Sequence, residues 1–241
     1  MTFLQKMMEK NRDYASAAPM VLAFLGDSVT HGVFEIDMNR EGQIGSVFDH
    51  EHVYHARLRR QLHAIAPAVA FNVINAGVNG GGSAQGLERL SRDVLAYQPD
   101  LVVVCFGLND VHGGREGLPA YLDNLHRIFQ EVRRQGADLI FLSPNCMNAY
   151  VPAYIKNPDL REVAARTAEL QNSGVMDLYM DGARRLCANE QVALCDCYSQ
   201  WRHLADIGID TTALLANGIN HPNRDMHELF STALFQKIIF G

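Results

Sequence analysis

Four residues in the sequence carry groups suited to acyl-transfer chemistry. Ser28 offers a hydroxyl that can act as a nucleophile, and His221 offers an imidazole that can accept its proton near neutral pH. Asn109 offers a side-chain amide, and Gly77 offers a backbone N–H that no side chain obstructs. Both can donate to an oxygen on which negative charge develops. A nucleophile, a base and oxyanion donors are together what acyl transfer requires.

Each of these residues also has an ordinary structural interpretation. Ser28 and the preceding Asp27 are good helix or turn caps, and Asn109 can bond its own backbone in a turn. The glycines over 77–82 could cradle a phosphate, although their spacing differs from G-x-G-x-x-G and no Lys-Ser/Thr ending follows. Most histidines have no catalytic role, and the chain has ten. The joint placement of the four residues is what favours chemistry.

The elements predicted around these residues place them at one edge of a sheet. Short apolar runs bounded by turn residues predict strands buried on both faces, which is typical of a parallel sheet. The runs are 20–25, 70–74, 101–106, 139–142 and 192–195. Ser28, Gly77 and Asn109 each follow one of the first three runs. Because ligands bind beyond the carboxyl ends of parallel strands, we expect the site there.

Helical periodicity fills the segments between the runs. Apolar residues recur at spacings of three and four over 52–65, 87–95, 121–132, about 159–186 and 225–240. Ser173-Gly174 predicts a break within the fourth segment. The alternation predicts an α/β fold, a three-layer α/β/α sandwich with a central parallel sheet. We expect an N-terminal helical extension over 1–19 and a single domain over 20–241.

In four blocks the sequence resembles the SGNH hydrolases, also called the GDSL esterase/lipase family. The blocks are Gly-Asp-Ser-Val at 26–29, Asn-Ala-Gly at 75–77 with the glycines after it, Gly-Leu-Asn-Asp at 107–110 and His-Pro-Asn at 221–223. The resemblance implies a flavodoxin-like SGNH hydrolase fold, hydrolysis of ester bonds and no metal or organic cofactor. It implies that Ser28 is the nucleophile and His221 the base. It also implies an oxyanion hole made by the N–H groups of Ser28 and Gly77 with the Asn109 amide.

The sequence departs from the family at the acid of the triad. The family usually has Asp three residues before the histidine, where this chain has Gly218, and the next residue back is Asn217. The third member of a triad orients the imidazole and stabilises its charged form. Three candidates remain open: Asn217 as the residue that orients His221, a backbone carbonyl, or a displaced acid. The displaced acid could be Asp206, Asp210 or Asp225.

The composition limits the other possibilities. The 241 residues are 48% hydrophobic and 20% charged, which is typical of a globular protein, and the length suggests one large or two small domains. A net charge of −6 argues against a nucleic-acid partner, and no run approaches the ~20 apolar residues that membrane insertion needs. Five cysteines without disulfide spacing and an N-terminus unlike a signal peptide predict a cytoplasmic protein with free thiols. The sequence gives no indication of the oligomeric state.

The substrate follows less directly from the sequence. The segments 30–48 and 143–158, which we expect to be loops around the site, mix aromatic and amide groups. That mixture favours a small-molecule acyl ester, for example an acetyl ester on a carbohydrate. Ser28 together with His221 predicts hydrolysis through an acyl-Ser28 intermediate. The alternatives are a lysophospholipase or thioesterase, and an SGNH-fold protein of weakened activity that binds an acylated ligand.

Overall fold

The computed structural model describes residues 2–38 and 44–241 and has a five-stranded parallel sheet at its centre, in the order β4-β1-β5-β6-β7. The strands are β1 (Met20–Gly26), β4 (Phe71–Gly77), β5 (Leu101–Cys105), β6 (Asp138–Leu142) and β7 (Ala193–Cys195). They coincide with the five apolar runs. β5 is buried along its whole length, as expected for a central strand covered on both faces.

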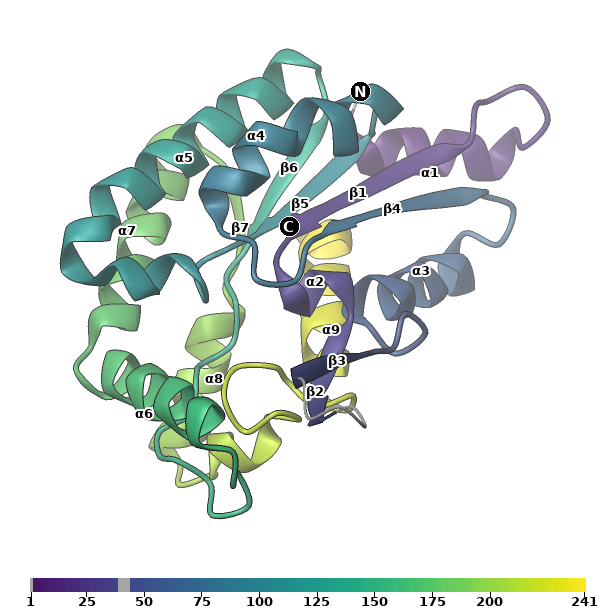
Figure 1. The fold of residues 1–241 in the computed structure, drawn as a ribbon. Helices are drawn as coiled ribbons and strands as arrows, with labels where there is room; N and C mark the ends of the chain where they lie inside the picture. The colour runs from purple at the N-terminus through teal and green to yellow at the C-terminus, as the bar shows by residue number, and fades with distance from the viewer. Residues whose placement is uncertain (1, 39–43) are drawn as a thin grey trace.

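Helices cover both faces of this sheet (Figure 1). One face carries α4 (Ser83–Asp93), α5 (Gly114–Arg134) and α7 (Val175–Glu190), and the other carries α3 (Tyr54–Ile65) and α9 (Met226–Phe240). α8 (Cys197–Asp206) packs beside α9. The predicted three-layer α/β/α fold is confirmed.

The long helical segment predicted near 159–186 is two helices. α6 (Pro158–Asn172) begins at an Asn157 cap, whose side chain accepts from the Leu160 N–H. It is separated from α7 by Gly174, which adopts a φ of 74°. A left-handed backbone costs glycine little and ends a helix, so the predicted break is confirmed.

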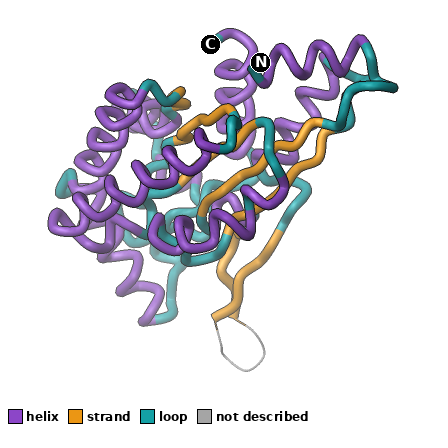
Figure 2. The backbone as a smooth tube through the Cα atoms, turned by 90° about the horizontal axis from the view of Figure 1, so that it is seen from above, coloured by secondary structure: helices purple, strands orange, loops and turns teal. Residues whose placement is uncertain are grey.

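A β-hairpin occupies the segment that we expected to be a loop. β2 (Val33–Met38) pairs antiparallel with β3 (Ile44–Phe48), so the prediction of a loop over 30–48 is wrong for its described part. Residues 39–43 lie outside the described residues. Its strands are only partly apolar, whereas continuous apolar runs indicate only strands that are buried on both faces. Figure 2 shows it projecting from the body of the molecule.

The first helix, α1 (Phe3–Arg12), packs into the core. Thr2 and Gln5 form a capping box at its start, and Phe3 and Met7 are buried in the main hydrophobic cluster. Lys6 forms a 2.8 Å ion pair with Asp100, just before β5. Thr2 and Gly241 both line a cavity of about 500 Å³.

Four short helices complete the described part of the chain. They are α2 (Ser28–His31), η1 (Leu95–Tyr97), η2 (Asp110–Gly113) and η3 (Thr211–Leu214). Within 2–38 and 44–241, no helix has both the length and the apolar character needed to cross a membrane.

Candidate active site

Ser28 and His221 meet beyond the carboxyl end of β1. The Ser28 Oγ lies 2.8 Å from the His221 Nε2, although 193 positions separate the two residues in the chain. Ser28 and His221 are 3% and 5% exposed, so little of either residue is open to solvent. A hydroxyl bonded to an imidazole nitrogen at this distance is the arrangement in which the base can remove the proton of the nucleophile.

Ser28 is positioned by the turn from β1 into α2. β1 ends at Gly26, and the side chain of Asp27 caps α2 by accepting from the Val29 N–H at 2.9 Å. Arg89 reaches from α4 and donates to the carbonyls of Ala76 and Gly26, at 2.5 and 2.8 Å. The capping interpretation of Asp27 is therefore correct. The cap leaves the Ser28 hydroxyl directed at His221.

The tautomer of His221 is set by a backbone carbonyl. Its Nδ1 lies 3.1 Å from the carbonyl oxygen of Phe34, on β2. Because a carbonyl only accepts, Nδ1 carries the proton, and Nε2 keeps a lone pair for the Ser28 hydroxyl. Burial lowers the pKa of His221 to about 4, against the opposing effects of the Phe34 bond and the Glu35 charge. The imidazole is therefore neutral at pH 7 and can act as a base.

Asn217 does not take the place of the missing acid at the ring. Its Oδ1 accepts from the N–H groups of Ile219, Asn220 and His221, at 3.0, 3.0 and 2.9 Å. It therefore shapes the loop that carries the histidine, while Phe34 occupies the Nδ1 position. The prediction that Asn217 orients the ring directly is wrong.

None of the three candidates for a displaced acid is bonded to the ring. Asp210 caps η3 and accepts from the Tyr150 hydroxyl at 2.6 Å, and the ring nitrogens are bonded to Ser28 and Phe34. The charge of Glu35 affects His221, and the sequence predicted Glu35 only as part of the segment 30–48 around the site. The backbone-carbonyl alternative is the one that the structure supports.

Gly77 has a packing role. Its N–H donates to the Asn75 side chain at 3.0 Å, and a Cβ built on it would lie 2.2 Å from the His31 backbone nitrogen. Only glycine lets β4 pass this close to α2. The expectation that the Gly77 N–H belongs to the oxyanion hole is therefore wrong, because this donor is already used inside the protein.

Gly80, on the same loop, is a candidate donor that sequence reasoning missed. Among the described residues its N–H has no partner, and neither does that of Ser28. The next residue, Gly81, accepts from the Asn109 Nδ2 at 2.9 Å, which places Gly80 beside the amide. The Asn109 amide has a second N–H to offer. The Asn79-Gly80 turn pair was the available signal.

Two buried carboxyls lie beneath these loops. Asp27 is fully buried, which raises its pKa to about 7, and the charge of Asp110 adds to the increase. Burial also raises the pKa of Asp110, against its bonds to the Ser83 N–H and hydroxyl at 2.8 and 2.5 Å. Asp110 thereby ties the loop before α4 to the loop before α5, and fixes Gly80 relative to Asn109.

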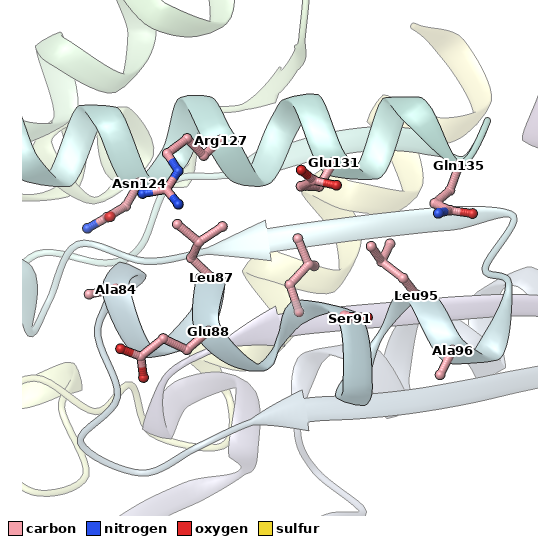
Figure 3. A pocket seen from close by; sticks show the side chains of 11 residues that line it. Ala84, Leu87, Glu88, Ser91, Leu95, Ala96, Asn124, Arg127, Glu131 and Gln135 are labelled. Atoms are coloured by element: carbon pink, nitrogen blue, oxygen red, sulfur yellow. The ribbon is translucent and has the colours of Figure 1, made fainter.

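A cavity of about 660 Å³ is separate from the Ser28–His221 pair. It lies between α4 and α5 and is lined by side chains such as Leu87, Arg127 and Glu131 (Figure 3). In 2–38 and 44–241, no group of three or more His, Cys, Asp and Glu side chains is arranged to hold a metal ion. The five cysteines are free and buried.

Comparisons with known proteins show the family and the fold of the chain. The model of the GDSL-like lipase/acylhydrolase family matches residues 24–229. Esterase TesA of Pseudomonas aeruginosa is 32% identical over 113 residues, which are 46% of this chain and 54% of TesA. An acetylxylan esterase of Geobacillus stearothermophilus is 33% identical over 95 residues, 37% of this chain and 39% of that protein. The match thus spans about half of the first relative and less of the second.

Solved structures share the fold. Axe2, an acetylxylan esterase from Geobacillus stearothermophilus, has a TM-score of 0.65 at 21% identity, covering 92% of this chain and 95% of its own. A lipase/acylhydrolase from Enterococcus faecalis has a TM-score of 0.65 at 21% identity, covering 91% and 95%. A two-domain esterase active on acetylated mannans has a TM-score of 0.64 at 18% identity, covering 97% and 52%.

The family match runs from within β1 to within α9 and includes Ser28, Asn109 and His221. The family match and the shared fold confirm the resemblance seen in the sequence. The chain belongs to the GDSL-like lipase/acylhydrolase family.

Proposed function

We propose that this chain is a carboxylic ester hydrolase that removes a small acyl group, in particular acetyl from a carbohydrate. The observation that carries the proposal is the 2.8 Å hydrogen bond from the Ser28 hydroxyl to His221 Nε2. The neutral, correctly oriented imidazole is the second requirement, and the Phe34 carbonyl supplies it.

The reaction has two halves. In the first, Ser28 Oγ attacks the ester carbonyl while its proton passes to His221 Nε2, and the oxyanion is met by the N–H groups of Ser28 and Gly80 and by the Asn109 amide. The His221 Nε2–H then protonates the departing alcohol, which leaves acyl-Ser28. In the second half, a water oxygen attacks the acyl carbonyl while its proton passes to Nε2. The Nε2–H then returns a proton to Ser28 Oγ as the Oγ–acyl bond breaks, and the acid leaves.

Two observations support a small acyl group on a sugar. The near-complete burial of Ser28 and His221 suits an acetyl group better than a long chain. Tyr150 and Tyr154, on the segment beside the His221 loop, are exposed and offer aromatic faces to a ring substrate. Relatives in sequence and structure are named as acetylxylan esterases.

Chain-length dependence tests this proposal. We expect turnover of p-nitrophenyl acetate to exceed that of the butyrate, with the octanoate slowest, and we expect acetylated xylooligosaccharides to release acetate. Ser28→Ala should lower kcat by about 10³-fold or more. Preference for the octanoate would instead indicate a lipase-like enzyme. Ligand binding without turnover in the native protein would indicate a binding protein. The observation that favours this second candidate is that the partner of His221 Nδ1 is an uncharged carbonyl, where a full triad has a carboxylate.

A further inference from the structure

We propose that Arg224 is a positioning residue, which holds the β2–β3 hairpin so that the Phe34 carbonyl stays on His221 Nδ1 in place of a triad carboxylate. The inference rests on the proposed function and deepens it. It assigns the role of the missing acid to a hairpin and to the side chain that anchors the hairpin.

A bulge in β2 presents the Phe34 carbonyl to the histidine. Val33 pairs with Phe48 and Ile36 pairs with Ser46, so two residues of β2 face one residue of β3 between these pairs. Bulges of this kind release a residue from the ladder and redirect it. Phe34 lies in the bulge, and its carbonyl accepts from His221 Nδ1 at 3.1 Å.

Arg224 anchors this bulge from the segment that carries the base. Its Nη1 and Nη2 donate to the two oxygens of Glu35, at 2.5 and 3.2 Å, and its Nε donates to Asp49 at 2.7 Å. Its guanidinium also lies 4.5 Å from the centre of the Phe34 ring. One side chain, three residues after His221, therefore contacts both residues of the bulge and the segment leaving β3.

The same contacts control the charge near the imidazole. The Arg224 hydrogen bonds hold the pKa of Glu35 below its usual range, so Glu35 is ionised and paired. Without Arg224 its carboxylate would stand unpaired near His221 and favour the protonated imidazole. We call the contacts of Arg224 with Phe34, Glu35 and Asp49 the clamp. The titratable and charged side chains around His221 and the clamp are Glu35, Asp49, His52, Arg57, Arg224 and His227.

A purely structural ion pair would behave differently. The side chains of Arg224 and Glu35 are 35% and 39% exposed, and pairs with this exposure contribute little to folding. A variant of Arg224 should therefore fold, which makes its kinetics interpretable. A positioning role affects both the turnover and the pH profile, whereas a structural role affects only the melting temperature.

The experiment compares Arg224→Gln with Arg184→Gln, measuring kcat and KM for p-nitrophenyl acetate across pH. Arg184 is a matched control because it also bridges two carboxylates, Asp181 and Asp196, at 2.6 and 2.8 Å, far along the chain from the hairpin. For Arg224→Gln we expect kcat to fall at least about tenfold with KM nearly unchanged. We expect the acidic limb to move up by about one pH unit. Arg184→Gln should change neither.

A second variant separates geometry from charge. Adding Glu35→Gln to Arg224→Gln removes the unpaired carboxylate, so the acidic limb should return to its native position while kcat stays low. If Arg224→Gln leaves both kcat and the limb unchanged, or if the control variant shows the same losses, the inference is wrong.

A readout independent of turnover keeps this inference distinct from the proposed function. The tautomer and pKa of His221 can be followed by NMR of the imidazole nitrogens in the native protein and in Arg224→Gln. An absence of esterase activity together with a raised His221 pKa in the variant would overturn the proposed function and support the clamp. Esterase activity in the native protein together with an unaltered tautomer and pKa of His221 in Arg224→Gln would support the proposed function and overturn the clamp.

Discussion

The imidazole of His221 lies between the Ser28 hydroxyl and the Phe34 carbonyl, at 2.8 and 3.1 Å. In chymotrypsin-like proteases, replacing the triad Asp by Asn lowers kcat about 10⁴-fold because the histidine adopts the wrong tautomer. A carbonyl only accepts, so Phe34 preserves the productive tautomer. What is lost is the negative charge that would stabilise the imidazolium.

The pH profile reports this loss. Because burial lowers the pKa of His221 to about 4, kcat/KM for p-nitrophenyl acetate should hold through pH 6 and fall only as pH drops through about 4. Asp27, with a pKa of about 7, is mostly protonated over that range and does not set the limb. An acidic limb near 6.5, the ordinary value for histidine, would show that a charge supports the ring after all.

The pH profile of kcat/KM needs a folding control, because the buried histidines also affect stability at low pH. His55, His221 and His227 have pKa values lowered to about 4, 4 and 3 by burial. The folded state therefore binds fewer protons than the unfolded state, and stability falls as pH drops below about 6.5. Circular dichroism at each pH, with recovery of activity on return to pH 7, distinguishes titration of the base from unfolding.

At the scale of elements, the site is assembled by close packing between loops that follow different strands. α2 lies against the end of β4, where a Cβ on Gly77 would meet the backbone of Thr30 and His31 at 2.6 Å or less. The loop before α4 is bonded to the loop before α5 through Asn109 and Asp110. The nucleophile and the oxyanion donors therefore depend on strand spacing as well as on their own types.

Gly77→Ala tests this dependence. The added methyl has no room, so α2 must shift, and we expect a large loss of kcat and a free energy of unfolding lowered by several kcal/mol, on the order of 3. Gly136→Ala is the matched control, because its left-handed φ of 76° adds strain while nothing lies within 4 Å of the new methyl. That control should cost about 1 kcal/mol and leave kcat unchanged. Native activity in Gly77→Ala would contradict the packing role.

The sequence predicted the parts of the site that depend on residue type. The apolar runs predicted that Ser28 and Asn109 follow strand ends. The chemistry of the imidazole pointed to His221. The donor at Gly80 and the acceptor at Phe34 are backbone groups, which every residue has, so only the tertiary structure can select them. Likewise, the sequence shows that position 218 is a glycine where the family has an acid. It does not show that the Phe34 carbonyl, 187 positions from His221, takes the place of that acid.

At the scale of the whole molecule, the active site and α1 lie at opposite ends of the parallel strands. The site lies at the carboxyl ends of β1, β4 and β5, while α1 lies at the other end of the strands (Figure 1). There Phe3 and Met7 are buried, Lys6 pairs with Asp100, and the Phe3 N–H donates to Asp138 at 2.6 Å. α1 is therefore expected to contribute to stability without affecting catalysis.

Met7→Ala tests whether α1 contributes to stability without affecting catalysis. Met7 is fully buried, so its truncation should lower the free energy of unfolding by about 2–5 kcal/mol, measured by denaturant titration. Met8, on the same helix, is 44% exposed, and Met8→Ala should have little effect. Both variants should keep native kcat at a temperature where they are folded. A loss of kcat in folded Met7→Ala would mean that the helix influences the site.

The central claim is that the Ser28 hydroxyl, activated by His221, is the nucleophile. The most direct test is to inactivate the protein with a fluorophosphonate and locate the adduct by peptide mass spectrometry, with Ser28→Ala and His221→Ala treated alongside. We predict one adduct, on Ser28, absent from Ser28→Ala and formed far more slowly in His221→Ala. An adduct on another residue, or unchanged esterase activity in Ser28→Ala, would contradict it.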